Sequence, residues 1–289
     1  MPAVQNARAV KRKIRSVGNI KKITRAMQMV AAAKLKKVQV RLMELRPYSD
    51  KIREFLEGLS AQVKDLDYPL FQPRAKVASI GLVVMMADKG LCGSYNANMV
   101  RYTQKFIEEK KKPVKVVAVG KKAAEWARKQ GLDPVAAYLQ LPTEIPFSQI
   151  KAMTKGIVEM FVSGGVDEVH LLFTRYVNAM TFKAGHVKFL PIEAEASKEK
   201  TLAHEYDFEP EPRKILDRLI PRYVEVSFHR LLLESFSSEH AARMNAMRNA
   251  TDSATDLISS LTLLYNNARQ AGITKELLDI VGGAEALKG

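Results

Sequence analysis

The chain has 289 residues, of which 47% are hydrophobic, and its formal net charge is +15 at pH 7. This length supports one core with long appendages, or two small domains. The longest apolar run, at residues 77–87, is too short to cross a bilayer, and no signal-peptide pattern begins the sequence, so any membrane role is expected to be peripheral. Cys92 is the only cysteine, which excludes an internal disulfide and multi-cysteine metal sites and fits a reducing cytoplasm.

The positive charge is concentrated at the start of the chain. Residues 1–46 contain thirteen lysines and arginines but one acidic residue, Glu44, so they carry +12 of the total and the remaining residues carry only +3. A solvated helix face is the simplest interpretation of a charge run. Because so many uncompensated charges repel one another, an acidic partner is the better interpretation.

The first predicted element is a long helix over residues 7–59. Its apolar residues recur with a period near 3.5, the value typical of a coiled coil. Pro47 is expected to bend the helix and Gly58 to end it. The apolar stripe is predicted to consist of Val10, Ile14, Val17, Ile20, Ile23, Met27, Val30, Val38, Leu42, Leu45, Ile52, Phe55 and Leu59.

The middle of the chain alternates between strands and helices. β-rich runs at 76–88, 113–120 and 166–176 are separated by helical patterns, which predicts a parallel or mixed sheet of Rossmann-like layout. The run at 181–192 is expected to add an edge strand. The helices are predicted at 96–111, 121–130 and 147–163.

A second long helix is predicted from Arg213 to about Val281. Fifty residues between Pro221 and Gly272 contain no glycine or proline, which corresponds to about 75 Å of helix. Its seam has alternating spacings of three and four, the pattern of a heptad repeat. The seam consists of Met244, Met247, Thr251, Ala254, Ile258, Leu261, Tyr265 and Ala268.

These patterns predict an α/β fold in which the two terminal helices form a long antiparallel coiled coil and the Rossmann-like domain is inserted between them. Alanines at every fourth position from Ala242 to Ala254 would allow a close approach of the helices. The expected parts are an N-terminal helix (1–60), the α/β domain (76–193), an acidic connecting loop (194–212) and a C-terminal helix (213–289).

No catalytic, cofactor-binding or metal-binding residues are predicted. The five histidines show no metal-ligand spacing, and the turn at 89–94 has neither the Walker nor the dinucleotide glycine pattern. Cys92 next to Lys89 could be a nucleophile, but a small buried thiol is the favoured interpretation. A basic coiled-coil nucleic-acid-binding protein is the alternative function, although no aromatic residue is interleaved with the basic residues of 1–46.

Four segments carry a family resemblance: KKITRAMQMVAAAKLKK, DKGLCGSYN, SSEHAARMNAMRNATDSATDLI and LYNNARQAGITKELLDIVGGAEAL. Together, and in this order, they resemble the gamma subunit of the F-type rotary ATP synthase. The resemblance implies a non-catalytic central shaft without cofactors, peripheral to the cytoplasmic face of a bacterial plasma membrane. It also implies alpha, beta and epsilon subunits and a membrane c-ring as partners, and coupling of proton translocation to ATP synthesis or hydrolysis.

The resemblance assigns roles to individual residues. Those implied to contact the catalytic subunits or to take part in coupling are Met27, Lys89, Cys92, Glu239, Arg243, Arg269, Gln270 and Thr274. Tyr206 and Glu209 are implied to meet the rotor ring and the epsilon subunit. Glu239 and Arg243, together with Arg248, are expected to keep their side chains available to the surrounding ring.

Two departures from the family pattern stand out. Gly93-Ser94-Tyr95-Asn96 replaces the usual two glycines followed by Leu-Asn, so the turn is expected to be tighter or differently exposed. The loop after Ile192 lacks a cysteine pair, so thiol regulation of the chloroplast kind is not expected.

Overall fold

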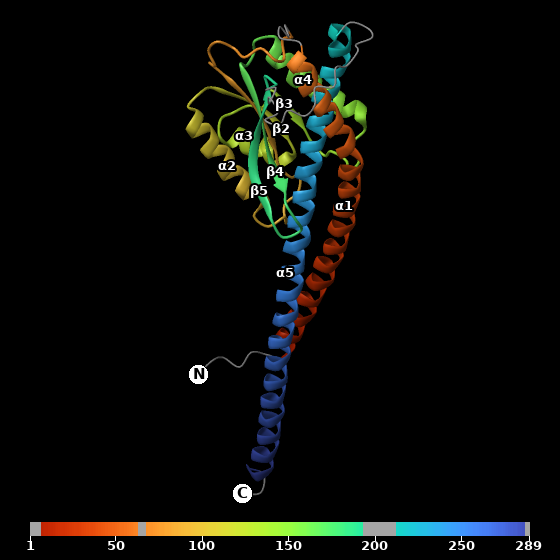
Figure 1. Ribbon diagram of the computed structural model, residues 1–289. Helices are drawn as coiled ribbons and strands as arrows, with labels where there is room; N and C mark the ends of the chain where they lie inside the picture. Colours follow the sequence, from red (N-terminus) through yellow and green to blue (C-terminus); the bar gives the residue numbers. More distant parts are fainter. Residues whose placement is uncertain (1–6, 63–67, 193–211, 287–289) are drawn as a thin grey trace. The chain divides into compact units, whose positions relative to one another are not determined.

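The computed structural model describes residues 7–62, 68–192 and 212–286 (Figure 1). The chain divides into two compact units. The terminal unit comprises residues 1–30 and 244–289, and the central unit comprises residues 31–243. Each long helix, α1 (Ala7–Gln62) and α5 (Pro212–Ala286), contributes residues to both units.

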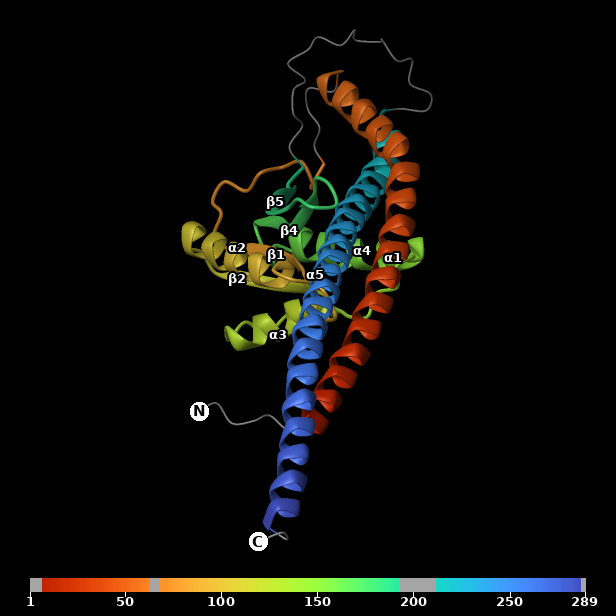
Figure 2. The ribbon, with the colours of Figure 1, turned by 90° about the horizontal axis from the view of Figure 1, so that it is seen from below.

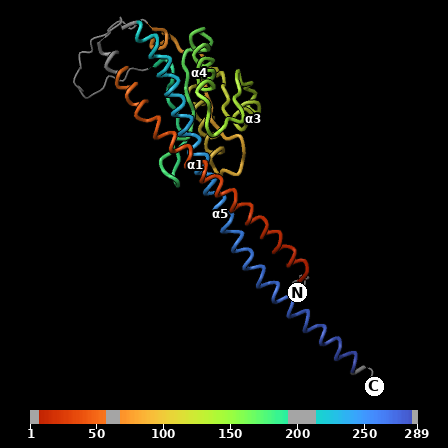
Figure 3. Tube along the Cα trace, turned by 90° about the vertical axis from the view of Figure 1, so that its right-hand side faces the viewer, coloured from red at the N-terminus to blue at the C-terminus, as the bar shows by residue number. Residues whose placement is uncertain are grey.

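The terminal unit is an antiparallel pair of helices. Figure 3 shows the first turns of α1 beside the later part of α5, which continues past the start of α1. The hydroxyl oxygens of Thr24 and Thr251 lie 2.8 Å apart and are buried. An apolar cluster lines the same seam, formed by Val10, Ile14, Val17, Ala254, Ile258, Leu261 and Tyr265. The predicted antiparallel coiled coil is therefore confirmed.

The predicted seam of α5 is confirmed, whereas the predicted stripe of α1 is partly wrong. Ile20, Ile23 and Val30 are 51–59% exposed. The heptad spacing that begins at Val10, Ile14 and Val17 continues through position 24, so the apolar residues at 20, 23 and 30 fall to one side of the seam. The buried position is occupied by Thr24, whose side chain is polar.

The long helices extend further than the sequence predicted. α1 continues through Gly58 to Gln62, and Pro47 lies inside it. Figure 2 shows α1 changing direction in its orange section, as expected because proline removes one helical hydrogen bond. α5 likewise continues through Gly272 to Ala286. Within the described residues, no helix is both long enough and apolar enough to cross a membrane.

The central unit contains a five-stranded mixed sheet with the strand order β3-β2-β1-β4-β5. The first four strands of this order are parallel, and β5 is antiparallel to β4 at the edge. All six residues of β1 are buried, as expected for a central strand made of one continuous apolar run. The strands are β1 (Ile80–Met85), β2 (Val114–Val119), β3 (Ala136–Tyr138), β4 (Glu168–Tyr176) and β5 (Phe182–Leu190).

Helices cover both faces of this sheet. Alternate residues of β1 point to opposite sides: Leu82 belongs to an apolar cluster with residues of α2 and α3, and Val83 to a cluster with residues of α4, α1 and α5. The predicted Rossmann-like layering is confirmed; only the short strand β3 was missed. The covering helices are α2 (Tyr95–Lys110), α3 (Lys121–Lys129) and α4 (Phe147–Val162).

Candidate coupling site

The turn at residues 88–93 joins β1 to α2 at the carboxyl end of the sheet. Asp88 fixes its beginning, because its Oδ1 accepts hydrogen bonds from the backbone N–H of Lys121 at 2.8 Å and of Gln140 at 3.0 Å. The turn then passes through left-handed backbone conformations at Leu91 (φ 61°) and Gly93 (φ 58°). This path leaves the side chain of Leu91 63% exposed at the tip of the turn.

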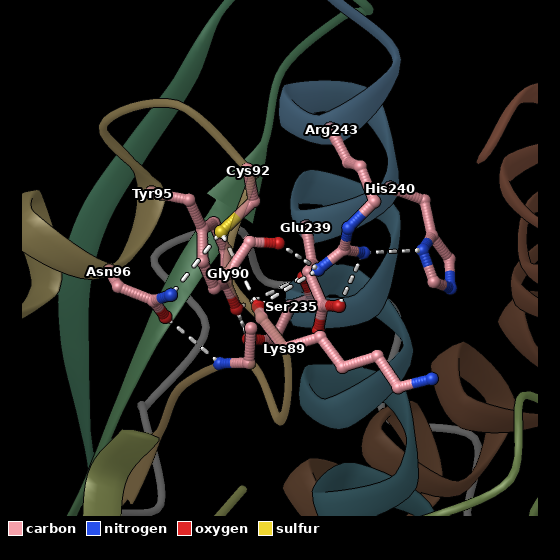
Figure 4. Close-up of polar contacts among 10 residues, drawn as sticks. Lys89, Gly90, Cys92, Tyr95, Asn96, Ser235, Glu239, His240 and Arg243 are labelled. Atoms are coloured by element: carbon pink, nitrogen blue, oxygen red, sulfur yellow. Dashed lines mark hydrogen bonds and ion pairs between the residues drawn. The ribbon is translucent and has the colours of Figure 1, made fainter. Parts of the chain in front are cut away.

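Cys92 lies beneath the turn rather than on its surface. The residue is buried, and the Nδ2 of Asn96 donates a hydrogen bond to the thiol sulfur at 3.2 Å (Figure 4). The Oδ1 of Asn96 in turn accepts a hydrogen bond from the N–H of Ala87 at 3.0 Å. Burial raises the pKa of the Cys92 thiol, despite the nearby guanidinium of Arg243. A buried structural thiol was the favoured interpretation, and the structure confirms it.

Arg243 of α5 ties the turn to the helix, and we call this group of contacts the clamp. Its Nη1 donates to the Oε1 of Glu239 at 2.7 Å, and its Nη2 donates to the carbonyl oxygens of Lys89 at 3.1 Å and Gly90 at 3.5 Å (Figure 4). Arg243 and Glu239 were expected to have side chains available to other subunits. Within this chain their side chains are instead only 12% exposed, because each satisfies the other.

Burial governs the titration of the groups around the clamp. It raises the pKa of Glu239, and the nearby Arg243 offsets this only in part. The Nδ1 of His240 lies 3.4 Å from the Nη1 of Arg243. Burial, together with the charges of Arg243 and Lys34, lowers the pKa of His240 to about 4. His240 is therefore neutral near pH 7 and adds no further positive charge beside Arg243.

A buried hydroxyl pair lies next to the clamp and was missed at the level of sequence. The hydroxyl of Tyr95 lies 2.8 Å from the Oγ of Ser235, and both residues are buried (Figure 4). The available signal was Ser235 itself, a polar residue close behind the apolar run at 231–233, which indicates a partner in the protein interior.

The structure brings together only part of the set of residues implied by the family resemblance. Lys89, Cys92, Glu239 and Arg243 meet in the clamp of the central unit. The terminal unit holds the half-buried Met27 and three exposed residues of α5. Those three are Arg269, Gln270 and Thr274. Tyr206 and Glu209 lie outside the described residues.

The clamp holds the turn after β1 against α5. In the part of the chain that is described, no three or more histidine, cysteine, aspartate or glutamate side chains are grouped so that they could hold a metal ion. The thiol is buried with a raised pKa, which disfavours the nucleophilic thiolate. The carboxylate at its centre, Glu239, is occupied by Arg243.

An antiparallel coiled coil of the chain ends and a Rossmann-like domain inserted between them in the sequence define a coiled-coil α/β protein. The sequence matches the ATP synthase family over residues 6–287. It is 40% identical over 286 residues to the ATP synthase gamma chain of Symbiobacterium thermophilum, covering 99% of both chains. It is 43% identical over 285 residues to that of Dehalococcoides mccartyi, covering 98% of this chain and 99% of the other.

Solved structures agree with this result. A chain of the Tetrahymena thermophila mitochondrial ATP synthase, solved as central stalk and c-ring, is 26% identical with a TM-score of 0.60, covering 79% of this chain and 99% of that one. A chain of the Euglena gracilis mitochondrial enzyme shares the fold, with a TM-score of 0.68 at 20% identity over 97% of this chain and 94% of that one. The chain belongs to the ATP synthase gamma chain family. These comparisons give no support to the nucleic-acid-binding alternative.

Proposed function

We propose that the chain is the central rotor shaft of an F-type ATP synthase, coupling proton flow through a membrane c-ring to ATP synthesis or hydrolysis in an alpha/beta hexamer. Full-length gamma chain relatives and a structural neighbour solved as central stalk and c-ring support this role. The chain itself is non-catalytic in this proposal. Different faces of the shaft contact the three catalytic sites at any moment, so each site adopts a different conformation. Rotation of the shaft is thereby coupled to the reaction at these sites.

The exposed apolar end of α5 is the observation that carries the proposal. Beyond the seam, five large apolar residues of the terminal unit are 49–68% exposed. A run of this kind on a water-exposed helix indicates a surface that another protein covers. An apolar surface of the surrounding subunits could cover these residues without strong directional bonds. Such bonds would have to break at each step of rotation. The residues are Ile273, Leu277, Leu278, Ile280 and Val281.

The basic part of α1 supports the same role. Residues 7–30 of α1 belong to the terminal unit, and most of their lysines and arginines are exposed. We propose that these charges, and the exposed Lys89 of the central unit, face acidic loops of the beta subunits. Long-range attraction between charges tolerates rotation better than short hydrogen bonds do, because it changes gradually with distance.

Individual residues take the following parts in this proposal. Cys92, Glu239 and Arg243 set the shape of the turn that carries Lys89, so they act on the catalytic subunits through that turn. Met27, Arg269, Gln270 and Thr274 contact the catalytic subunits directly. Tyr206 and Glu209 meet the c-ring and the epsilon subunit.

We also propose the division of the chain into an N-terminal helix (1–60), the α/β domain (76–193), a connecting loop (194–212) and a C-terminal helix (213–289). The bacterial origin of the gamma chain relatives supports a position on the cytoplasmic face of a bacterial plasma membrane. Attachment there is peripheral, through the complex.

Reconstitution with the alpha and beta subunits of the same organism tests the function. We expect the chain to co-purify with them and a bead fixed to it to rotate when ATP is added. A chain that stays monomeric and binds duplex DNA with a steep salt dependence would contradict the proposal.

The seam offers a sharper test in the complete membrane complex. Ala254 is 6% exposed and packs in the seam of the terminal unit, so Ala254→Leu overpacks the helix pair. We expect the ratio of proton pumping to ATP hydrolysis to fall while the complex still assembles. Ala254→Ser, which changes the side-chain volume little, is the control. Equal coupling in both variants would count against a shaft whose helix packing matters.

A further inference from the structure

A basic cavity of about 650 Å³ opens in the central unit, and none of its lining residues belongs to the clamp. Its volume lies in the usual range for small-molecule sites, about 300–1,000 Å³. The walls come from α1, from α5 and from strands β4 and β5. All of its lining residues lie within the central unit.

The polar part of the lining is strongly cationic. Four arginines and one lysine point to one concave surface, against a single carboxylate, Glu234. Burial raises the pKa of Glu234, and the charges of Arg230, Arg175 and Arg46 offset part of this rise. The cationic residues are Arg46, Arg53, Arg175, Lys188 and Arg230.

Three of these cations already have carboxylate partners. Lys188 pairs with Glu168 at 3.1 Å, and Arg53 pairs with Asp50 at 3.3 Å. Arg230 lies 3.7 Å from the same aspartate and 3.6 Å from Glu234. Three carboxylates therefore compensate three cations.

The remaining two cations, Arg46 and Arg175, have no hydrogen-bonded or ion-paired partner anywhere among the described residues. They influence Glu234 only electrostatically. The cavity consequently presents two uncompensated guanidinium groups, from α1 and from β4. Planar guanidinium groups bind the oxygens of phosphate with paired hydrogen bonds.

The cavity also has an apolar and aromatic wall. Phe71, Tyr176, Phe189 and Tyr223 line it together with aliphatic residues. Phosphate alone would leave this wall in contact with water. A ligand with an apolar or aromatic body attached to the anionic group would cover it.

We propose that this cavity binds a small phosphate monoester, a dianion near neutral pH, with its phosphate between Arg46 and Arg175 and its organic body against the aromatic wall. Two uncompensated positive charges match the charge of such a group, which is between −1.5 and −2 at pH 7. This assignment does not use the proposed rotor function, since none of the lining residues belongs to the clamp or to the terminal unit.

Isothermal titration calorimetry on the full chain tests the proposal at constant ionic strength. The probes are AMP, inorganic phosphate, adenosine, acetate, and phosphatidylcholine vesicles with and without phosphatidylserine. We expect AMP to bind more tightly than phosphate, and adenosine and acetate not to bind. The double variant Arg46→Gln/Arg175→Gln should weaken AMP binding by roughly tenfold or more, because it removes both charge-assisted contacts.

A variant with the same change in net charge controls for diffuse electrostatics. Arg128→Gln/Lys151→Gln removes two exposed cations that do not line the cavity, and should change AMP affinity by less than about twofold. The variant Arg46→Lys/Arg175→Lys keeps the charges but loses the paired geometry, so its affinity should be intermediate. Circular dichroism confirms that each variant folds.

Three results would overturn the proposal. The first is no binding of AMP or phosphate at millimolar concentration. The second is an equal loss of affinity in the two glutamine variants, which would indicate general surface charge. The third is binding only to vesicles that contain anionic lipid, which would make this a membrane-contacting surface.

Discussion

The central unit and the terminal unit are stabilised by very different amounts of buried apolar surface. In the central unit, two extensive clusters fill both faces of the sheet, and side chains such as Phe161 and Phe173 are almost completely inaccessible to solvent. In the terminal unit, the buried apolar cluster consists of Val10, Val17, Ala254 and Leu261, with three half-buried neighbours. A close-packed core specifies shape, whereas a single row of contacts specifies mainly which helix faces its partner.

The largest effect is expected from a cavity in the central core. Phe161→Ala should lower the free energy of unfolding by about 3–5 kcal/mol, because Phe161 is 1% exposed in the cluster between α4 and the sheet. Trp126 is the only tryptophan and lies in this unit, so its fluorescence during urea unfolding reports the central unit alone. Val162→Ala, at an exposed neighbouring position, should change little. Similar losses in both variants would contradict a close-packed core.

The next effect concerns acid stability of the central unit. The folded pKa of His240 is about 4 and its ordinary value is 6.5, so the unfolded chain binds the additional proton between these values. Stability from this group is therefore present above pH 6.5 and is lost as the pH falls towards 4. The loss should be on the order of 3 kcal/mol.

His240→Gln should remove this part of the pH dependence, measured as the urea midpoint from pH 4 to 7. Glu239 acts in the opposite direction, because its raised pKa gives stability that is lost as the pH rises, so the effect of His240 is the difference between native and variant chains. His186→Gln is the comparison: His186 is exposed, and its pKa is lowered mainly by partial burial. A native pH profile that persists in His240→Gln would disprove the assignment.

The central unit has an extensive apolar core and the terminal unit a single row of contacts, and this difference explains how far the sequence could predict each structure. β1 was predicted because it is a continuous apolar run buried on both faces. β2 and β4 were predicted because apolar residues dominate them and most of their residues are buried. β3 was missed because its three residues are too few to show a pattern. The buried stripe of α1 was predicted from its apolar residues alone. In the structure the heptad position is occupied by the buried Thr24, and the neighbouring Ile23 is exposed.

The clamp could not be predicted from local patterns. Arg243 lies 154 residues from Lys89 in the sequence, and their contact exists only because the fold brings α5 to the turn after β1. Motif resemblance selected both residues, but without indicating that they contact each other. Spacing reveals which face of a helix is buried, whereas the partner of a long side chain depends on the tertiary fold.

A smaller loss is expected from the corresponding cavity in the terminal unit. Leu261→Ala should cost about 2 kcal/mol, at the low end for such a change, because a two-helix seam can relax around the gap. Amide hydrogen exchange of residues 244–268 is the measurement, and the fluorescence of Trp126 should not change. Leu263→Ala, at a position 66% exposed, is the control. A simultaneous shift of the tryptophan signal would mean that the two units unfold together.

The smallest effect concerns the buried pair of threonine hydroxyls within this seam. Thr24→Val keeps the side-chain shape but removes the hydroxyl that lies 2.8 Å from that of Thr251, so a loss of about 1 kcal/mol is expected by hydrogen exchange. Thr251 keeps its bond to the carbonyl oxygen of Met247 at 2.8 Å, which limits the cost. Replacing both threonines with valine removes both buried hydroxyls, so the double variant should be more stable than the sum of the single changes implies. If the stability changes of the two single variants add up to that of the double variant, the two hydroxyls do not interact. The spacing of the apolar residues alone would then set the register of the two helices.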